Sequence, residues 1–320
     1  MKKALLYIAY TIAYGFWWVM SLLPLWVLYR LSDLLYYVIT YVVRYRHDVI
    51  WNNLSTSFPE KSKAELREIE HQFYHWFCDY LVETVKLMSI SKRQLMQRMT
   101  FTGMEQIHEI LSEGQSIGVY LGHLGNWEWI TSLPYWTSNG LCCQLYHPLE
   151  NEYFDRLFKY VRELHGALCI PMQESLRKII TLSREGKPLI VGYISDQVPL
   201  WWNIHHWVDF LNHDTPVLTG AERIIKHTGQ AFFYGHVTRV KRGHYNCEMR
   251  LISRNTKEKA DFEITDLYYK ELERSIKNQP ELYLWSHNRW KRTREEFNKN
   301  WEVKNGKVVK RKKEQPQPQG

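Results

Sequence analysis

The chain of 320 residues is 45% hydrophobic and 15% aromatic, which allows one large α/β domain or two small ones with a sizeable core. Its formal net charge of +8 indicates an anionic partner such as nucleic acid, anionic lipid or an acidic carrier protein. The five cysteines are odd in number and contain no C-x-x-C spacing. This argues against a disulfide framework or a zinc ribbon and favours a reduced, cytosol-facing domain.

The first 43 residues are the most apolar part of the chain. Ala4 to Leu23 contains no charge, and as a helix these residues match the ~30 Å hydrocarbon core of a bilayer. The next segment, 24–43, carries Arg30 and Asp33 and is rich in Tyr, so we expect it to lie at the membrane interface. Residues 1–43 are therefore predicted to be a membrane anchor with an interfacial helix. A cleaved signal peptide is disfavoured, because no small-x-small cleavage site follows.

Basic residues predict the orientation of the chain and the nature of its end. Those in 30–46 outnumber the two lysines before the anchor, so the positive-inside rule places the main domain, residues 44–301, in the cytoplasm. Residues 302–320 carry Lys and Arg and then alternate Gln with Pro, which predicts a basic, disordered tail. Such a tail can hold the protein to anionic lipid or simply keep it soluble.

A long helix is predicted from residue 62 to residue 87. Ser62 and Glu65 have the spacing of a capping box, and apolar residues then recur at helical spacing. His71 and His75 are four apart and can share a metal, but no third ligand stands in register. We therefore interpret both as histidines of an amphipathic helix. Glu83 lies on the same helix and is assigned no role.

A buried strand that stops at a histidine is the central feature of the sequence. Residues 117–121 supply the apolar strand, and the glycines around His123 predict a sharp turn. Asn126 is a good N-cap for a helix after the turn. His123 and Glu128 are five apart, so the turn can bring the imidazole and the carboxylate together.

This pairing predicts a general base. A carboxylate that holds one imidazole nitrogen fixes the tautomer, and the other nitrogen can then accept a proton from a hydroxyl. We predict His123 as the base and Glu128 as the residue that orients it. Residues 117–129 contain no Ser or Cys as an obvious nucleophile, so the hydroxyl would belong to a substrate. The start of the following helix can help to stabilise an oxyanion.

Strands and helices alternate after this turn. Strands are predicted at 141–146, 168–171 and 188–195, helices at 152–165, 175–184, 218–227 and 261–278, and a hairpin at 231–251. The order predicts an α/β fold with a mixed, mostly parallel sheet flanked by helices. Asp196 and Gln197 follow a buried strand, at the edge of such a sheet where ligands bind.

Two later stretches combine aromatic residues with histidines or bases. The loop 200–207 is interpreted as a contact for lipid or an acyl chain. His205, His206, His213 and Asp214 suggest a metal site, but their spacing fits no standard one. Residues 281–291 mix aromatics with bases such as Arg289. This mixture suits a contact with the membrane surface and an anionic lipid head group, and it suits a buried aromatic helix end with solvated bases equally well.

Four ordered stretches resemble the bacterial lipid A late acyltransferases, lauroyl/myristoyl type, of the glycerolipid acyltransferase superfamily. They are His123-x4-Glu128, Asp196-Gln197, residues 210–223 and residues 283–291. The resemblance extends from the anchor to Lys291. It implies transfer of an acyl chain from an acyl carrier protein thioester to a hydroxyl of a lipid A precursor. It also implies direct attack without an acyl-enzyme, no cofactor or metal, and a place at the bacterial inner membrane.

The resemblance also implies which residues bind the substrates. These are Asn126, Arg162, Arg177, Asp196, Gln197 and Arg289. The family's Tyr-Arg-Pro reads Tyr-His-Pro here, with His147 at the arginine position, and Arg162 is the favoured substitute ahead of Arg156. This departure leaves open a lysophospholipid or an amino-acid lipid as acceptor.

Two alternatives belong to other functional classes. A membrane-tethered nucleic-acid-binding protein would fit the charge and the aromatic residues, but the sequence has no recognised nucleic-acid motif and its bases are spread rather than striped. A metal-dependent hydrolase would use the histidines of residues 205–214, and sensitivity to chelators would reveal it. We therefore expect a lipid acceptor and no nucleic acid.

Overall fold

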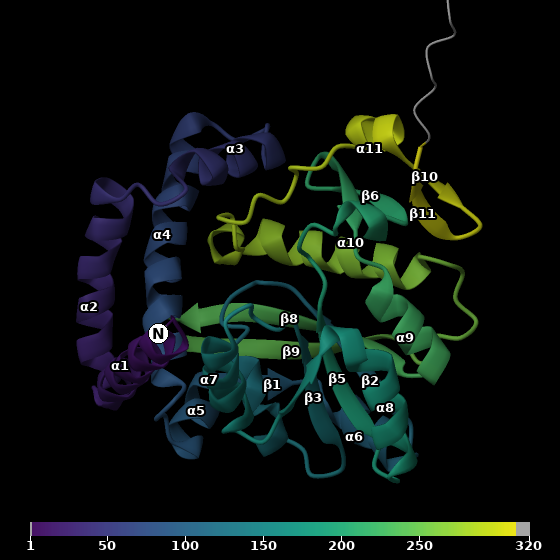
Figure 1. The fold of residues 1–320 in the computed structure, drawn as a ribbon, viewed down its shortest axis with the longest axis horizontal. Coiled ribbons are helices and arrows are strands. Elements are labelled where there is room, and N and C mark those ends of the chain that lie inside the picture. The colour runs from purple at the N-terminus through teal and green to yellow at the C-terminus, as the bar shows by residue number, and fades with distance from the viewer. Residues whose placement is uncertain (1, 312–320) are drawn as a thin grey trace, which may run out of the picture.

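The centre of the protein is a seven-stranded sheet in the order β1-β9-β8-β2-β5-β3-β4 (Figure 1). The computed structural model describes residues 2–311. The strands are β1 (Met99–Thr102), β2 (Ile117–Leu121), β3 (Leu141–Tyr146), β4 (Leu168–Pro171), β5 (Leu189–Ile194), β8 (Ala231–Lys241) and β9 (His244–Ser253). Neighbouring strands run parallel except β8 and β9, which pair antiparallel. The predicted α/β fold with a mixed, mostly parallel sheet is confirmed.

Helices make up most of the remaining chain. They are α1 (Lys2–Leu22), α2 (Leu25–Tyr37), α3 (His47–Ser57), α4 (Lys63–Lys86), α5 (Lys92–Arg98), α6 (Met104–Ser112), α7 (Glu152–Glu163), α8 (Ser175–Arg184), α9 (Gly220–Thr228), α10 (Glu263–Asn278) and α11 (Arg294–Asn300). The predicted capping box is present, because Ser62 accepts from the Glu65 N–H and Glu65 accepts from the Ser62 N–H. It fixes the start of α4, the long helix that stands between α2 and the sheet (Figure 1).

Helices cover both faces of the sheet. Successive residues of a strand point to opposite sides, so each strand contributes to two cores. In β2, Ile117, Val119 and Leu121 join a core with residues of α6 and α7. Tyr120 of the same strand points to the other face, into a core shared with α8, α9 and α10. The apolar run of β2 is thus explained by burial on both sides.

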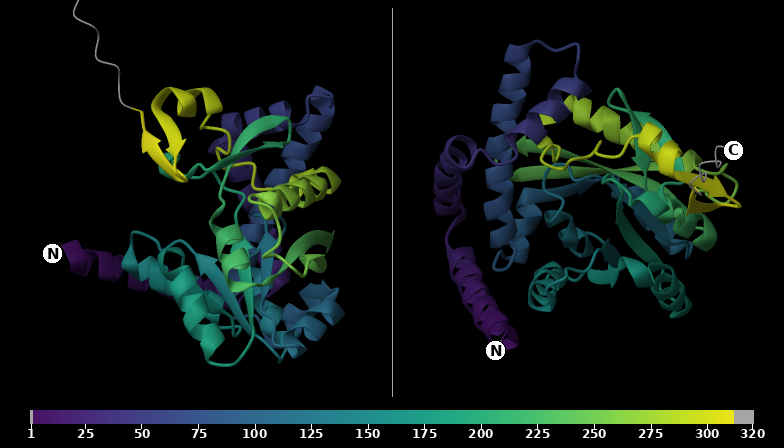
Figure 2. Two further views of the ribbon diagram at one scale, coloured as in Figure 1. Left: turned by 90° about the vertical axis from the view of Figure 1, so that its right-hand side faces the viewer. Right: turned by 45° about the horizontal axis from the view of Figure 1, so that its top comes forward.

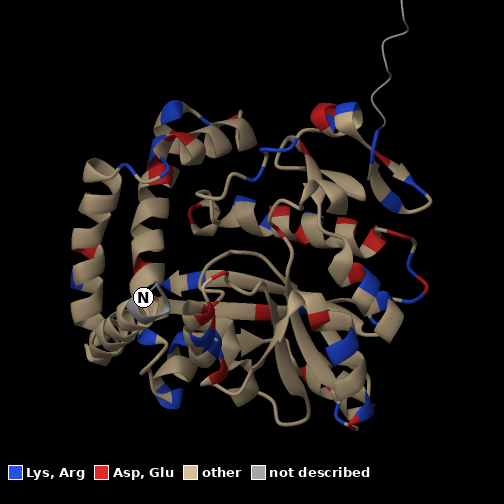
Figure 3. Ribbon diagram, in the orientation of Figure 1, with Lys and Arg blue, Asp and Glu red and all other residues tan. Residues whose placement is uncertain are grey.

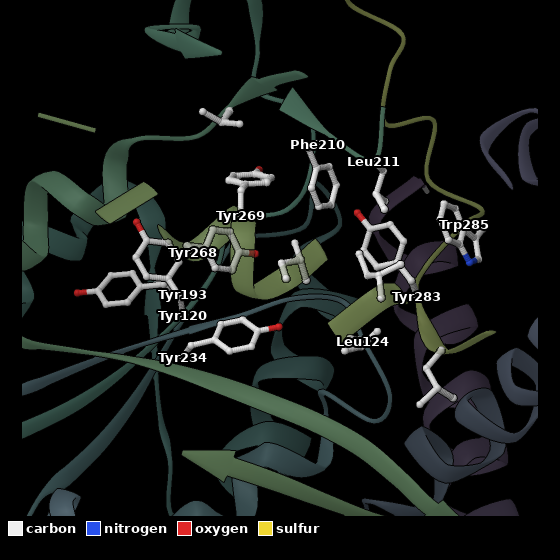
Figure 4. Packing of buried hydrophobic residues seen from close by; sticks show 14 of the residues in the cluster. Tyr120, Leu124, Tyr193, Phe210, Leu211, Tyr234, Tyr268, Tyr269, Tyr283 and Trp285 are labelled. Carbon is white, nitrogen blue, oxygen red and sulfur yellow. The ribbon is translucent and has the colours of Figure 1, made fainter. Parts of the chain in front are cut away.

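A layer of aromatic side chains, which includes Tyr120, Tyr234 and Tyr268, packs between the sheet and α10 (Figure 4). Two of its tyrosines bind the ends of neighbouring strands: the Tyr268 hydroxyl donates to the Leu121 carbonyl at 2.8 Å, and the Tyr269 hydroxyl donates to the Ser195 carbonyl at 2.9 Å. Both hydroxyls are buried, so these bonds satisfy groups that would otherwise be costly. They fasten α10 to the ends of β2 and β5, where the chemically active residues follow.

The N-terminal helices pack on the rest of the protein along one side only. The Trp17 indole donates to the Val85 carbonyl, and the Lys86 ammonium donates to the carbonyls of Ser21 and Leu23. Within the described residues, no helix taken alone is long and apolar enough to cross a bilayer, whereas the pair Leu6–Leu22 and Leu25–Val42, bent by 118°, passes on length and composition. The membrane anchor therefore stays a prediction, and by this criterion it needs both helices rather than the first alone.

Two small hairpins complete the structure (Figures 1 and 2). One joins β6 (His206–Phe210) to β7 (His213–Val217) and packs on α10. The other joins β10 (Trp301–Lys304) to β11 (Lys307–Lys310). The prediction of a disordered tail from residue 302 is therefore wrong for this hairpin, where alternate backbone groups pair across the strands. Residues 312–320 lie outside the described part of the chain, and the predicted domain boundaries stay predictions.

Candidate functional site

The site is built where β2 and β5, adjacent and parallel in the sheet, both end. His123 follows β2 and Asp196 follows β5. The His123 Nδ1 and the Asp196 Oδ1 are 2.7 Å apart, and the His123 backbone N–H donates to the Asp196 Oδ2 at 3.0 Å. Residues far apart in sequence thus form a tight pair because the sheet places their strands side by side.

This pair fixes one tautomer of the histidine. Because the carboxylate accepts from Nδ1, the other nitrogen, Nε2, is left with its lone pair. The Gln197 side-chain Nε2 lies 3.4 Å from the His123 Nε2. His123 keeps 19% of its side chain exposed, whereas Asp196 keeps 2%. The arrangement can accept a proton from a hydroxyl that approaches Nε2.

The charge state of the pair is set by opposing effects. Burial alone would raise the pKa of Asp196, but the charge of His123 and the hydrogen bonds from its side chain and backbone N–H outweigh burial and lower that pKa below its ordinary value. Asp196 is therefore ionised at neutral pH, and it can stabilise a protonated His123.

Residues 282–289, called the C-terminal segment below, pack against the turn that carries His123. The Leu284 N–H donates to the His123 carbonyl at 3.1 Å, and the Gly125 N–H donates to the Leu282 carbonyl at 3.0 Å. Gly125 has a φ of 60°, and a Cβ there would lie 2.7 Å from the Val237 side chain. This position therefore needs glycine.

His287 comes from the same C-terminal segment. Its Nε2 accepts from the Val198 N–H at 3.3 Å. Burial lowers the pKa of His287 to about 4, so this histidine is neutral at pH 7. It serves as a hydrogen-bond acceptor for the loop that carries Asp196, a contact that sequence reasoning missed.

Arg289 lies inside the protein, which agrees with the buried one of the two positions that the sequence left open for its segment. It is 1% exposed, and its Nη2 donates to the Pro216 carbonyl at 2.8 Å and to the Tyr269 hydroxyl at 3.1 Å. Its Nε and Nη1 find no partner among residues 2–311. Its guanidinium is thus held within the protein, and its role in substrate binding stays a prediction.

Glu128 does not hold His123, which corrects the expected pairing. Its two oxygens accept from the Arg162 Nε at 2.8 Å and from the Arg162 Nη2 at 2.6 Å. A bidentate pair with an arginine outcompetes a single bond to an imidazole, and Asp196 already occupies the histidine Nδ1. The structure brings Glu128 and Arg162 together, with Arg162 stacked over the Phe158 ring.

Asn126 is buried behind the turn. Its Oδ1 accepts from the Trp129 N–H at 3.0 Å. The helix that follows is a 3₁₀ helix, Trp129–Tyr135, rather than an α-helix, and its N-cap residue is Glu128 rather than the predicted Asn126. Its Nδ2 donates to the Glu83 Oε2 at 2.7 Å. Asn126 has no exposed surface, so a direct contact with substrate is not available to it in this state.

Arg177 lies away from this cluster. It stands on α8, is 80% exposed and pairs with Glu174 at 3.5 Å. Such an exposed pair contributes little to stability. The structure therefore brings together His123, Asp196 and Gln197, with Arg289 behind them, and it does not bring Arg177 to them.

A second histidine–aspartate pair lies beside a cavity. The His206 Nε2 and the Asp266 Oδ1 are 2.7 Å apart, at a cavity of about 560 Å³ between β6 and α10. Asp266 is 43% exposed, so water weakens its hold on the histidine. We prefer the His123 pair as the candidate site, because its carboxylate is buried and lies at the end of a central strand.

The histidines and the aspartate of residues 205–214, whose spacing fits no standard metal site, do not form a metal-binding group in the described part of the chain. His213 stacks on the Trp290 ring at 4.1 Å, and Asp214 pairs with Arg294. Across residues 2–311, no group of three or more His, Cys, Asp or Glu is placed to hold a metal. The metal-dependent hydrolase thereby loses the residues that suggested it.

Comparison with known protein families decides what the site belongs to. The family described as bacterial lipid A biosynthesis acyltransferase matches residues 1–292. The chain belongs to this family. The match includes every residue of the His123 site, and it makes the protein an acyltransferase of lipid A biosynthesis. No single curated protein matches the chain.

The Glu128–Arg162 pair of this lipid A acyltransferase can be tested by its effect on folding. Arg162→Met should leave the Glu128 carboxylate, which is 7% exposed, without its cation, and we expect a loss of about 3 kcal/mol in the free energy of unfolding. Adding Glu128→Gln to this variant should restore most of the loss, as measured by urea unfolding. If Glu128→Gln alone abolishes turnover while stability is normal, Glu128 acts in the chemistry instead.

Proposed function

We propose that the protein transfers a fatty acyl chain from an acyl carrier protein to a hydroxyl of a lipid A precursor at a membrane surface. The observation that carries the proposal is the His123–Asp196 pair, whose imidazole is partly exposed and has its Nε2 beside the Gln197 amide, in a chain of the lipid A acyltransferase family. A histidine held in this way is suited to remove a proton from an alcohol.

The proposed reaction proceeds in one acyl transfer. The His123 Nε2 takes the proton of the acceptor hydroxyl while the oxygen attacks the thioester carbonyl, and the buried Asp196 stabilises the imidazolium that forms. The tetrahedral intermediate then expels the carrier thiolate, and His123 gives its proton to this leaving group. The product is an ester, and no acyl-enzyme or cofactor takes part.

The oxyanion of the intermediate needs hydrogen-bond donors near the base. The Gln197 amide is the side-chain donor beside the His123 Nε2, and we assign it this role. Arg162 is engaged with Glu128, so we do not assign it to the thioester. Gln197→Ala is therefore expected to lower kcat and to change KM little.

The N-terminal helices supply a surface for the lipid. Exposed apolar side chains recur along α1 at helical spacing, namely Ile8, Ile12, Phe16 and Val19, and α1 and α2 are nearly free of charge (Figure 3). Such a stripe, with Trp and Tyr beside it, suits insertion into the interface of a bilayer. The positive charge of the whole chain, +8, favours both anionic lipid and an acidic carrier protein.

Reconstitution tests the proposed function directly. The purified chain is placed in phospholipid vesicles with a fatty acyl thioester of acyl carrier protein and one acceptor at a time: a lipid A precursor, a lysophospholipid or an amino-acid lipid. We expect mass spectrometry to find a new ester on the lipid A precursor only. Acylation of one of the other acceptors instead would assign that alternative, and a preference for the coenzyme A thioester would exclude the carrier protein as donor.

A further inference from the structure

Glu83 is a fully buried carboxylate in the last turn of α4 that the proposed chemistry does not use. Its Oε1 accepts from the Tyr29 hydroxyl at 2.9 Å. Its Oε2 accepts from the Asn126 Nδ2 at 2.7 Å and from the Tyr245 hydroxyl at 3.0 Å. One side chain therefore connects the N-terminal helix α2, strand β9 and the turn that carries His123.

Helix α4 holds the histidine turn at further points. The Glu83 carbonyl accepts from the Trp129 indole at 3.2 Å. One turn earlier in α4, the Tyr80 ring packs on the Trp127 ring at 4.2 Å, and Trp127 in turn contacts the edge of the His123 ring at 5.0 Å. Asn126, Trp127 and Trp129, which follow His123 in the chain, are thus all contacted by the same helix.

A carboxylate is a costly group to place here. Burial, with the charge of Asp79 one turn away, raises the pKa of Glu83 to about 7 even though three side chains donate to it. An apolar residue would fill this place at lower cost. A buried polar group whose partners come from several elements fixes their relative positions, which is the use that best explains it.

We propose that Glu83 is a positioning residue for His123, and that it couples the seating of α2 on α4 to the geometry of the histidine turn. Through Asn126, it sets the path of the chain between His123 and the following 3₁₀ helix. Through Tyr29, it makes that path depend on α2, a helix of the apolar N-terminal pair. This inference rests on the proposed function for its kinetic consequences, and on the hydrogen bonds alone for its structural ones.

The chemistry of the partners predicts which replacement is tolerated. A glutamine at position 83 can accept from Asn126 and Tyr245 with its carbonyl and can donate its amide to the Tyr29 oxygen, because a tyrosine hydroxyl also accepts. Alanine removes all of these bonds and leaves the buried Asn126 amide without its partner. Rescue by glutamine therefore separates hydrogen-bonded positioning from a need for charge.

The test uses the full chain in vesicles with the acyl carrier protein thioester and the lipid A precursor. Glu83→Ala should lower kcat by ~10- to 100-fold with little change in KM, as expected when a reacting group is misplaced, and Glu83→Gln should stay close to the unchanged protein. Tyr29→Phe, which removes only the bond from α2, should lower kcat several-fold. Ser32→Ala is the matched control, since Ser32 joins α2 to α4 through Asp79 at 2.7 Å and does not touch Glu83.

Hydrogen exchange of the amides in residues 122–128 gives a readout that does not depend on activity. We expect faster exchange in Glu83→Ala and in Tyr29→Phe, and unchanged exchange in Ser32→Ala. Unchanged exchange and kcat in Tyr29→Phe, or a Glu83→Gln variant as impaired as Glu83→Ala, would overturn the proposal. If the unchanged protein transfers no acyl group, the proposed function fails, and the exchange experiment alone then decides the role of Glu83.

Discussion

Replacing His123 with alanine is expected to lower kcat for acyl transfer by ~10²–10⁴, the range for loss of a general base. The expectation follows from geometry: the imidazole Nδ1 is held by Asp196, the Nε2 lies 3.4 Å from the Gln197 amide nitrogen, and the side chain is partly exposed. KM for the lipid acceptor should change little, because the proton is moved in the transition state and not in the bound substrate complex. Steady-state kinetics in vesicles measure both constants.

His227→Ala is a suitable control for this experiment. His227 is an exposed histidine on α9, so its loss tests whether removing any imidazole matters. The unfolding midpoint of His123→Ala should be measured beside its turnover, because the buried Asp196 loses its side-chain partner. Turnover by His123→Ala at a rate close to that of the control would reject His123 as the base.

Asp196→Asn is expected to lower kcat by ~10³–10⁴, because an asparagine amide in this place favours the wrong tautomer of the histidine it contacts. Donation from the amide of the substituted side chain would put the lone pair of His123 on Nδ1 and the proton on Nε2. The base would then face the substrate already protonated. The hydrogen bond of the Asp196 Oδ2 to the backbone N–H of His123 can be kept by the amide oxygen, so the fold should survive.

The second histidine–aspartate pair supplies the matched control for this variant. Asp266→Asn makes the same chemical change in a pair with the same 2.7 Å spacing, on the exposed side of α10. We expect normal kcat in Asp266→Asn. If Asp266→Asn is inactive while Asp196→Asn is active, the reaction takes place at the cavity beside His206 and not at the end of β2.

The sequence predicted the sheet well and the partner of the histidine poorly, for one physical reason. Strands such as β2 and β5 are buried on both faces, so their apolar runs are visible in the sequence. The order of strands within a sheet is not visible there. The short spacing from His123 to Glu128 suggested a contact, whereas the adjacency of β2 and β5 selected Asp196, which is 73 residues away.

The position of Asp196 after a buried strand was nevertheless a usable signal. It stands at the carboxyl edge of the predicted sheet, and ligand sites gather at that edge. Treating it as a partner for His123, and not only as a substrate contact, would have required knowing that the two strands are neighbours. The contact of His287 with the Asp196 loop had no comparable signal, because it depends on how the C-terminal segment folds back.

Tertiary packing also overruled local sequence rules elsewhere. The two-residue turn between β6 and β7 places Leu211 and Asn212 at φ values of 52° and 64°, and a leucine is rarely found in that backbone region. Leu211 is fully buried and its N–H donates to Glu273, so packing holds a conformation that its residue type disfavours. A sequence pattern alone does not report such a turn.

The most direct test of the account is the lipid A of cells that lack this protein. Mass spectrometry should find a lipid A species one acyl chain lighter than normal. The full chain should restore the missing ester, Asp266→Asn should restore it equally well, and His123→Ala or Asp196→Asn should not. Unchanged lipid A in cells without the protein, or full restoration by His123→Ala, would contradict the assignment of His123 and Asp196 as the base that acylates a lipid alcohol.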